Sequence, residues 1–312
     1  MKKMKFALCF KKLVPALAAG VFAPGAAFAC ACGCGVFDVA TSAMLPQQPG
    51  GMAFLQYDYQ DQNQNWNGVS RASADHNSDR EIETHFATVG LQYMVNRSWG
   101  AQLELPYDFR GYSGVDGAGQ PVSRNWSGLG DMRLEGVYTG FSPDLSSGLT
   151  FGLKLPTGSY NRFADVIDRD TQLGSGSTDL LLGGFHRARF GDSHWSWFAQ
   201  AELDVPMLKQ GDYRPGLEAD AAAGVYYDRL SVGRLKIAPL AQIIGSWRGR
   251  DNGAAADAAD SGYQRVLLSP GVEFHLHPFK FYADAEIPVY QNMTGNQLVA
   301  PVLLKVSLTY MF

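Results

Sequence analysis

Apolar and polar residues alternate with a period of two along most of the chain after residue 51. Leu103, Leu105 and Tyr107, for example, share one face, whereas Gln102 and Glu104 share the other. This is the period of a β-strand with one apolar and one polar environment, and no helical period follows residue 51. The pattern predicts strands over residues 52–60, 82–94, 100–110, 129–141, 148–158, 178–188, 195–205, 216–227, 235–248, 264–276, 279–290 and 300–312.

The number and length of these segments point to a membrane barrel. Twelve is an even number, and segments of roughly 9 to 14 residues can cross a bilayer core when tilted by about 45°. Short turns such as 96–98 and 277–278 alternate with long connections such as 61–81 and 159–177. The sequence therefore predicts an all-β fold, a single antiparallel up-and-down transmembrane β-barrel of about 12 strands over residues 51–312.

The alternative for the same pattern is a water-soluble β-sandwich, which would bury the faces that we assign to lipid. The end of the chain favours the barrel, because Val306, Leu308, Tyr310 and Phe312 share one face of the last strand. This ending resembles the C-terminal strand signal that the outer-membrane assembly machinery reads. Tyr310 and Phe312 are therefore the candidate assembly signal, and outer-membrane lipid and the assembly machinery are expected partners.

Residues 1–29 have the pattern of a secretory signal peptide. Five lysines precede an apolar stretch, and Ala27, Phe28 and Ala29 form the exit before Cys30. A retained helical anchor is the alternative, although Pro and Gly interrupt the apolar stretch. Export followed by a barrel predicts the outer membrane of a Gram-negative cell. Removal of five lysines and no acid lowers the formal charge from -4 to -9, and this acidic balance disfavours nucleic acid as a partner.

Residues 30–50 form a separate N-terminal segment that contains Cys30, Cys32 and Cys34. An odd number of thiols cannot all pair within one exported chain. The three could bind a soft metal ion such as Cu(I) or Zn(II), although no paired His or second CxxC completes a four-ligand site. Lipid on Cys30, a disulfide or a simple tether are the alternatives. The apolar residues of 35–46 could plug the modest lumen that twelve strands enclose.

The polar faces of the strands carry more acids than bases, which predicts a lumen that favours cations in an aqueous path. The alternative is that interior acids and bases pair with each other and stiffen the barrel. Asp131 and Asp179 follow glycine-rich loops and are candidates for fixing those loops. The acids near the outer rim are the candidates for selectivity: Glu104, Asp108, Glu202, Asp204 and Glu286.

Part of the lumen is expected to be apolar, because the strands at 180–185 and 237–244 are apolar on both faces. The side chains expected to add to this apolar wall are Phe198, Tyr226, Tyr282 and Tyr290.

Proline marks a weak repeat in the strands. Pro106, Pro156 and Pro206 are spaced by 50 residues, and each ends a similar four-residue segment of a strand that follows a short turn. Pro288 ends a similar segment. Because proline cannot donate to the strand ladder, each is expected near a strand end at the outer rim.

Three glycine-rich motifs carry a family resemblance: Gly128-Leu129-Gly130-Asp131, Leu155-Pro156-Thr157-Gly158 and Gly174-Ser175-Gly176-Ser177-Thr178-Asp179. They resemble a family of outer-membrane proteins described as transporters of a phenol-degradation meta pathway, distantly similar to fatty-acid channels. The resemblance covers about residues 80–312. It implies a twelve-stranded barrel that passes hydrophobic or aromatic compounds, and it implies no catalytic residues.

No enzyme signature is found, because the chain has neither a Gly-x-Ser-x-Gly elbow nor an HExxH motif. The sequence therefore predicts a non-enzymatic channel or transporter for small solutes, with hydrophobic or aromatic compounds first. Apart from a soft metal ion at the N-terminal cysteines, no cofactor is expected. The alternatives are a metal-cation channel, a metal-responsive barrel that uses Cys30–Cys34, and a sheath for a separate electron-transfer or efflux partner. The solute and the oligomeric state are left open.

Overall fold

The computed structural model describes residues 45–46, 49–163 and 167–312. The segment expected to be a signal peptide, 1–29, and Cys30, Cys32 and Cys34 lie outside these residues, as does most of the expected plug. The regular structure of the described chain consists of strands, apart from short 3-10 turns at Ala74–His76 and Arg169–Thr171. None of its helices is long and apolar enough to cross a membrane.

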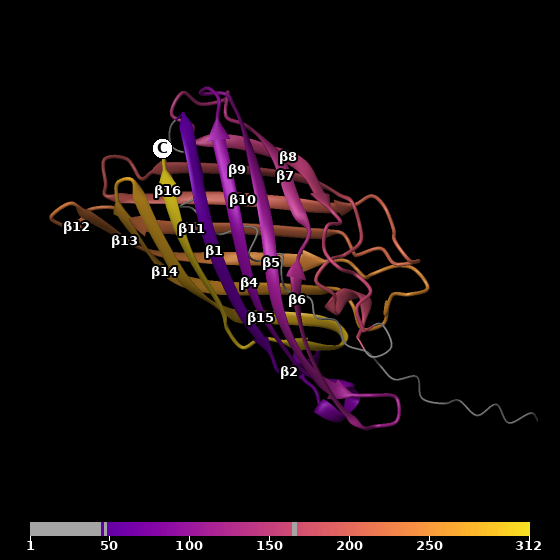
Figure 1. Cartoon of the computed structure of the whole chain (residues 1–312). Helices are drawn as coiled ribbons and strands as arrows, with labels where there is room; N and C mark the ends of the chain where they lie inside the picture. The colour runs from indigo at the N-terminus through magenta and orange to yellow at the C-terminus, as the bar shows by residue number, and fades with distance from the viewer. Residues whose placement is uncertain (1–44, 47–48, 164–166) are drawn as a thin grey trace, which may run out of the picture.

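Twelve strands form a closed antiparallel barrel, in which each strand pairs with its neighbours in chain order (Figure 1). The ring closes between the first and last strands, from Met52 opposite Met311 to Gln60 opposite Leu303. Closure satisfies the backbone without an exposed edge, as a membrane requires. The wall strands are β1 (Gly50–Gln62), β4 (Asp79–Met94), β5 (Trp99–Val115), β7 (Met132–Tyr138), β8 (Ser147–Leu155), β9 (Asp179–Arg189), β10 (Trp195–Pro206), β11 (Glu218–Tyr227), β13 (Leu235–Arg248), β14 (Tyr263–Leu276), β15 (Phe279–Val299) and β16 (Leu303–Met311).

The twelve predicted strands and the alternation of short and long connections are confirmed, but most of the connection expected between the strands 279–290 and 300–312 is part of β15. Pro106 and Pro288 lie within β5 and β15 rather than near strand ends, because both strands continue past them. Four further strands extend the wall: β2 (Gln64–Gly68), β3 (Ser70–Arg71), β6 (Pro121–Leu129) and β12 (Leu230–Val232). The expected strand 129–141 is interrupted at Gly130 and Asp131, between β6 and β7. The connection expected between the strands 100–110 and 129–141 is largely a hairpin, because β5 and β6 stay paired as far as Val115 and Pro121.

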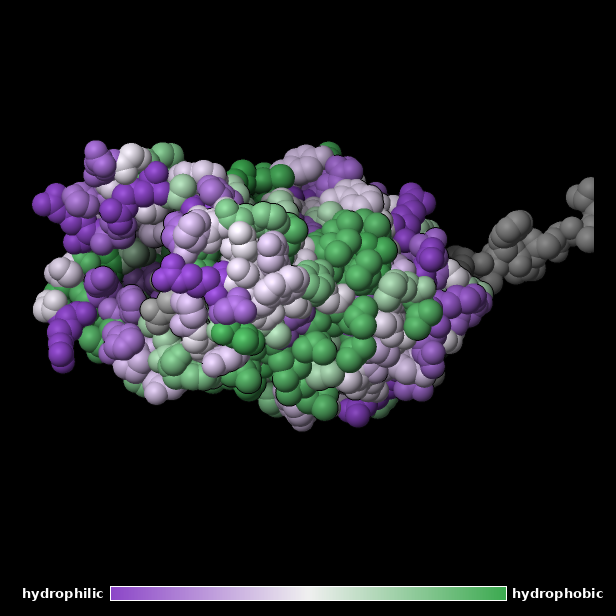
Figure 2. All heavy atoms as spheres, turned by 90° about the horizontal axis from the view of Figure 1, so that it is seen from above, coloured by the Kyte–Doolittle hydropathy of each residue, from purple (hydrophilic) through white to green (hydrophobic). Residues whose placement is uncertain are grey.

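The two faces of the barrel differ in polarity, as the alternation predicted. Figure 2 shows an apolar band between two polar ends. Aromatic pairs lie on the outer face at the end with the short turns, such as Trp99 with Tyr138, whose rings are 4.6 Å apart, and Trp195 with Tyr227, 5.1 Å apart. Such pairs are typical of the membrane interface.

The candidate assembly residue Tyr310 is exposed at this same end, as is Phe312. Their rings are 6.1 Å apart. The backbone N–H of Gly51 donates to the carbonyl of Phe312 at 2.8 Å, so the two ends of the barrel wall are joined here. Their role as an assembly signal stays a prediction.

Part of the lumen is filled by apolar side chains, as expected from strands that are apolar on both faces. Leu181, Ile244, Phe198 and Tyr282 are all fully buried. Tyr290 is different and faces outward, because an irregularity at Val266 shifts the register of β14 and β15 by one residue. A one-residue shift moves a side chain to the opposite face. One apolar cluster joins side chains of five strands and a loop: Phe86, Ala222, Ile244, Leu267, Ala300 and Leu303.

Candidate functional site

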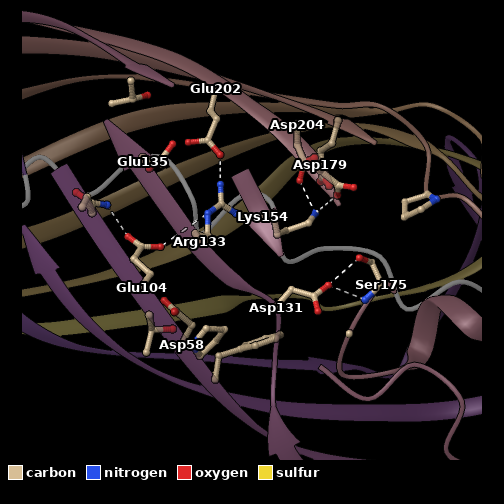
Figure 3. A pocket seen from close by; sticks show the side chains of 18 of the residues that line it. Asp58, Glu104, Asp131, Arg133, Glu135, Lys154, Ser175, Asp179, Glu202 and Asp204 are labelled. Atoms are coloured by element: carbon tan, nitrogen blue, oxygen red, sulfur yellow. Dashed lines mark hydrogen bonds and ion pairs between the residues drawn. The ribbon is translucent and has the colours of Figure 1, made fainter. Parts of the chain in front are cut away.

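A cavity of about 290 Å³ lies inside the barrel. Its wall combines charged side chains with Phe54, Phe86, Leu173 and Phe185. Figure 3 shows carboxylates and bases of several strands pointing into this space. Among the described residues, ten acidic side chains line it: Asp58, Glu104, Asp108, Asp131, Glu135, Asp170, Asp179, Glu202, Asp204 and Glu218. Five basic side chains line it: Arg110, Arg133, Lys154, Arg169 and Arg248.

The register of four neighbouring strands places charges in one row across the wall. Glu104 on β5 lies opposite Arg133 on β7, Arg133 lies opposite Lys154 on β8, and Lys154 lies opposite Asp179 on β9. The order along the row is negative, positive, positive, negative. Each of the two bases therefore has an acid on the neighbouring strand: Glu104 beside Arg133, and Asp179 beside Lys154.

Arg133 joins two of the predicted selectivity residues. Its guanidinium is 3.8 Å from the Glu104 carboxylate and makes an ion pair with Glu202 on β10. Glu104 also accepts a hydrogen bond of 2.6 Å from Gln102, which in turn accepts one of 2.6 Å from Gln92. A continuous polar chain thus runs from β4 to β10 along one side of the cavity (Figure 3).

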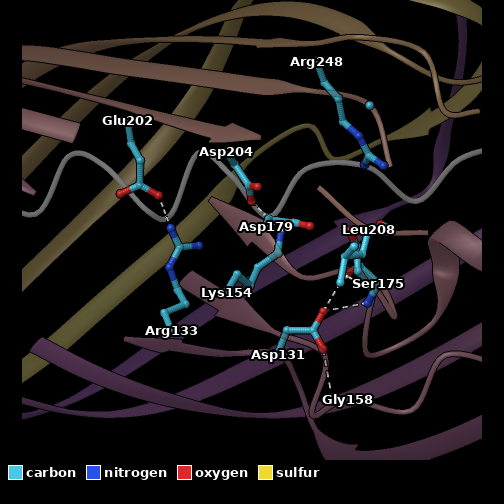
Figure 4. Close-up of polar contacts among 12 residues, drawn as sticks. Asp131, Arg133, Lys154, Gly158, Ser175, Asp179, Glu202, Asp204, Leu208 and Arg248 are labelled. Carbon is cyan, nitrogen blue, oxygen red and sulfur yellow. Dashed lines mark hydrogen bonds and ion pairs between the residues drawn. The ribbon is translucent and has the colours of Figure 1, made fainter. Parts of the chain in front are cut away.

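Lys154 makes the second charged contact of the cavity. Its Nζ lies 2.6 Å from Asp179 and also pairs with Asp204, another predicted selectivity residue (Figure 4). Glu104, Lys154 and Asp204 each stand two residues before a proline of the 50-residue repeat. The repeat therefore sets them at equivalent heights on different strands, which is the sequence signal that could have predicted their proximity.

The structure thus brings Glu104, Glu202 and Asp204 together around Arg133 and Lys154. Glu286 lies apart from them, fully buried and 3.7 Å from Lys305, and it does not line the cavity. Asp108 lines the cavity without belonging to either ion pair. The arrangement shows that interior acids and bases do pair, so selectivity can come only from the charge that remains. That these acids set selectivity stays a prediction.

Asp131 holds the long connection between β8 and β9, residues 156–178. Its carboxylate accepts hydrogen bonds from the backbone N–H of Gly158 at 3.0 Å and from the N–H and Oγ of Ser175, both at 2.7 Å (Figure 4). Thr157 Oγ1 donates to the carbonyl of Gly130 at 2.7 Å. The three glycine-rich motifs of the sequence therefore meet at one point, where Asp131 holds the connection 156–178 rather than the glycine-rich loop that it follows.

Glycine is required where these motifs meet. A Cβ on Gly174 would lie 2.6 Å from the α-carbon of Gly158, closer than any side chain can pack against backbone. The two parts of the loop that contain Gly158 and Gly174 can approach this closely only because neither residue has a side chain.

The rest of this loop folds into the outer end of the barrel. Arg110 on β5 donates hydrogen bonds to the carbonyls of Thr171 at 2.5 Å and Gln172 at 3.0 Å. Ile167 and Leu173 are buried in an apolar cluster with side chains of the wall: Ile82, Tyr112, Trp126 and Leu298. Because residues of the loop line the cavity, the loop narrows the path from the long-loop end.

Asp168 and Asp170 of this loop are buried close to other acidic side chains. Burial, with neighbouring Asp170, Asp79, Asp257 and Asp260, raises the pKa of Asp168 to about 9. Burial raises the pKa of Asp170 to about 8. The nearby carboxylates of Asp251, Asp79 and Asp257 also raise this pKa, whereas the positive charge of Arg248 lowers it. The folded loop therefore binds protons more tightly than a released loop, in which both carboxyls would have ordinary pKa values.

The position of the loop is accordingly expected to depend on pH. Because the pKa values are raised in the folded loop, its stability falls as pH rises from the ordinary carboxyl range, about 4, towards about 8 to 9. In planar bilayers, the wild-type conductance is expected to rise severalfold between about pH 5 and about pH 9. An Asp168→Asn/Asp170→Asn variant should stay low throughout. An equally steep rise in this variant would show that other groups control the loop.

The described residues give partial information on the N-terminal segment. Leu45 is buried against Met94, Val137, Leu145 and Phe185 inside the end with the short turns, and Leu45 and Pro46 line the cavity. The rest of the expected plug lies outside the described residues. Within the described part of the chain, no three His, Cys, Asp or Glu side chains are grouped to hold a metal ion. The soft-metal site at Cys30, Cys32 and Cys34 stays a prediction.

No protein-family model matches this chain, and no curated protein sequence is significantly similar to it. Its structure is similar to the crystal structure of the COG4313 outer membrane channel from Pseudomonas putida F1, with a TM-score of 0.64 and 14% identity over 88% of this chain and 100% of that chain.

Two further structures are similar. The β domain of the Bordetella autotransporter BrkA has a TM-score of 0.53 and 14% identity over 85% of this chain and 100% of that domain. CymD, a monoaromatic hydrocarbon channel, has a TM-score of 0.44 and 11% identity over 92% of this chain and 94% of its own. The similarity to the COG4313 channel confirms the expected resemblance to outer-membrane barrel channels at the level of the fold. In fold, this chain is a twelve-stranded antiparallel β-barrel similar to a known outer membrane channel.

Proposed function

We propose that this protein is an outer-membrane channel for small solutes, with hydrophobic or aromatic compounds as the preferred class. The observation that carries the proposal is the cavity of about 290 Å³ inside a closed barrel, in which aromatic and aliphatic side chains lie beside charged groups. Several of these charged groups pair with each other, so part of the wall is left to apolar contacts with a solute. The similarity in fold to an outer membrane channel supports this role.

The arrangement of charges supports a solute path more than catalysis. Arg133 and Lys154 are each shared between two acids, so these groups hold each other in place. We therefore propose a transport role without a reaction. A metal ion held by Cys30, Cys32 and Cys34 remains an alternative that belongs to the N-terminal segment rather than to the cavity.

The proposal is tested by ion currents through the mature chain in planar bilayers. Stepwise currents are expected, together with transient blocks when benzyl alcohol is added on the long-loop side. Thr150 lines the cavity, so a Thr150→Trp variant should fill it and lower the conductance by at least about half. Val289 is exposed on the outer face, and Val289→Trp adds the same bulk towards lipid and should leave the current unchanged.

Two results would contradict the proposal. Absence of current at every pH, even in a variant with a released loop, would exclude a channel. Currents without any block by benzyl alcohol would keep the channel and remove the preference for aromatic solutes.

A further inference from the structure

One row of the barrel places an aromatic ring between two carboxylates. Asp58 on β1 lies opposite Phe86 on β4, and Phe86 lies opposite Asp108 on β5. All three line the cavity, with exposed fractions of 2%, 8% and 3%. The Arg110 guanidinium lies 5.9 Å from the centre of the Phe86 ring, over one of its faces.

Asp108 differs from the other acids of the cavity in its contacts. Asp58 accepts a hydrogen bond of 2.8 Å from Gln56, Asp131 holds the loop, and the remaining predicted selectivity acids are in ion pairs. Asp108 receives no hydrogen bond and no ion pair from any described residue, and its Oδ1 is buried. Arg110, two residues along the strand, instead donates to Thr84 at 3.0 Å and to two loop carbonyls.

A buried carboxylate without a hydrogen-bond partner is costly unless a cation accompanies it. The charge of Arg110 offsets part of this cost and the charge of Asp131 adds to it, and the wall fits closely around the carboxylate. The Oδ2 atom lies 2.8 Å from the position that a Cβ of Gly130 would occupy, and the Pro106 ring is 3.0 Å from the same point. Leu173 of the inward loop lies next to Gly128. Gly130 of the motif 128–131 therefore makes room for this carboxylate.

The chemistry of this wall fits an organic ammonium ion better than a metal ion. A metal ion needs several ligands, and the described residues provide no group of three suitable side chains. An ammonium group needs one carboxylate, and it gains further stabilisation from the face of an aromatic ring. The excess of acids along the described wall of the cavity also favours entry of a cation.

We propose that Asp108, with the Phe86 ring and the adjoining Pro106 and Leu173, forms a binding site for organic ammonium ions that carry an apolar or aromatic body. This inference rests on the proposed channel function and specifies its solute class. The carboxylate binds the charge, and the ring and the aliphatic side chains contact the body.

Binding of benzylammonium and of its neutral counterpart benzyl alcohol to the detergent-solubilised mature chain tests the proposal by isothermal titration calorimetry at neutral pH. Wild type is expected to bind benzylammonium at least about tenfold more tightly, a typical value for a charge-assisted contact. Asp108→Asn should abolish this difference. Asp192→Asn, which removes one carboxylate from an exposed turn, should retain it. Phe86→Leu, which keeps the apolar bulk, should weaken benzylammonium binding severalfold.

Several results would overturn the proposal. These are equal affinity for the two probes, no measurable binding of benzylammonium, an unchanged preference in Asp108→Asn, or displacement by micromolar Ca²⁺, which would indicate a metal site. If Asp108→Asn does not fold, as judged by its heat-dependent mobility on gels, the Phe86→Leu comparison decides. Ion currents distinguish the two proposals. If the barrel conducts ions but does not prefer benzylammonium, the ammonium site is contradicted and the channel is not. If the barrel binds benzylammonium but does not conduct, the channel is contradicted and the binding site is not.

Discussion

Replacement of Asp131 by alanine is expected to raise the conductance of the channel severalfold, with the barrel wall intact. The substitution removes the acceptor of three hydrogen bonds, two from Ser175 and one from Gly158. A hydrogen bond to a charged group contributes about 1.5 to 3 kcal/mol. A loss of about 3 kcal/mol would shift the ratio of folded to released loop by roughly a hundredfold.

The wall should survive this change, because Asp131 lies between β6 and β7 and its side chain takes no part in the strand ladder. Single-channel currents in planar bilayers measure the effect. Ser175→Ala provides a graded control, since it removes the Oγ bond and leaves the backbone bond to Asp131. Its conductance should lie between wild type and Asp131→Ala. Equal conductance in all three proteins would show that Asp131 does not hold the loop in place.

The wall of the barrel could be predicted from sequence because its cause is local. In β5, Leu103 and Leu105 alternate with Gln102 and Glu104, and this alternation survives in any β-sheet that separates lipid from a polar lumen. The sequence also indicated that Asp131 fixes a loop, since it directly follows a glycine-rich turn, but not which loop, because its partners Gly158 and Ser175 are 27 and 44 residues away. Tyr290 shows the limit of such reasoning, because one irregularity in pairing reversed its face.

The arrangement inside the lumen could not be predicted in the same way. Arg133 and Glu202 are 69 residues apart and meet only because closure sets the relative heights of β7 and β10. The alternation of apolar and polar residues shows which side chains face the lumen. It does not show which side chain of another strand each of them contacts there. Likewise, Ile167 and Leu173 lie in a loop rich in polar residues, and their burial under the outer mouth follows from the anchor at Asp131. The 50-residue spacing of Lys154 and Asp204 was the one sequence signal that these two side chains lie close together.

The second large effect is expected at Arg133. Replacement of Arg133 by glutamine should destabilise the barrel by about 3 kcal/mol, because it leaves Glu104 and Glu202 facing each other without their shared base. It should also increase the preference for cations, since the cavity wall loses a positive charge. Urea unfolding in detergent measures the first effect, and the reversal potential in a KCl gradient measures the second.

The matched variants separate pairing from selectivity. Glu104→Gln/Glu202→Gln removes two negative charges and leaves Arg133 in place, so the reversal potential should move towards zero or beyond it. Arg133→Gln/Glu104→Gln/Glu202→Gln replaces the whole charged group by amides, and its stability should be within about 1 kcal/mol of wild type, since removal of all partners leaves no unpaired buried charge. If the triple variant were as unstable as Arg133→Gln, packing of the arginine stem rather than its charge would stabilise the wall. If the reversal potential were the same in all variants, Glu104 and Glu202 would have no part in selectivity, and the unpaired Asp108 would remain as the acid that sets it.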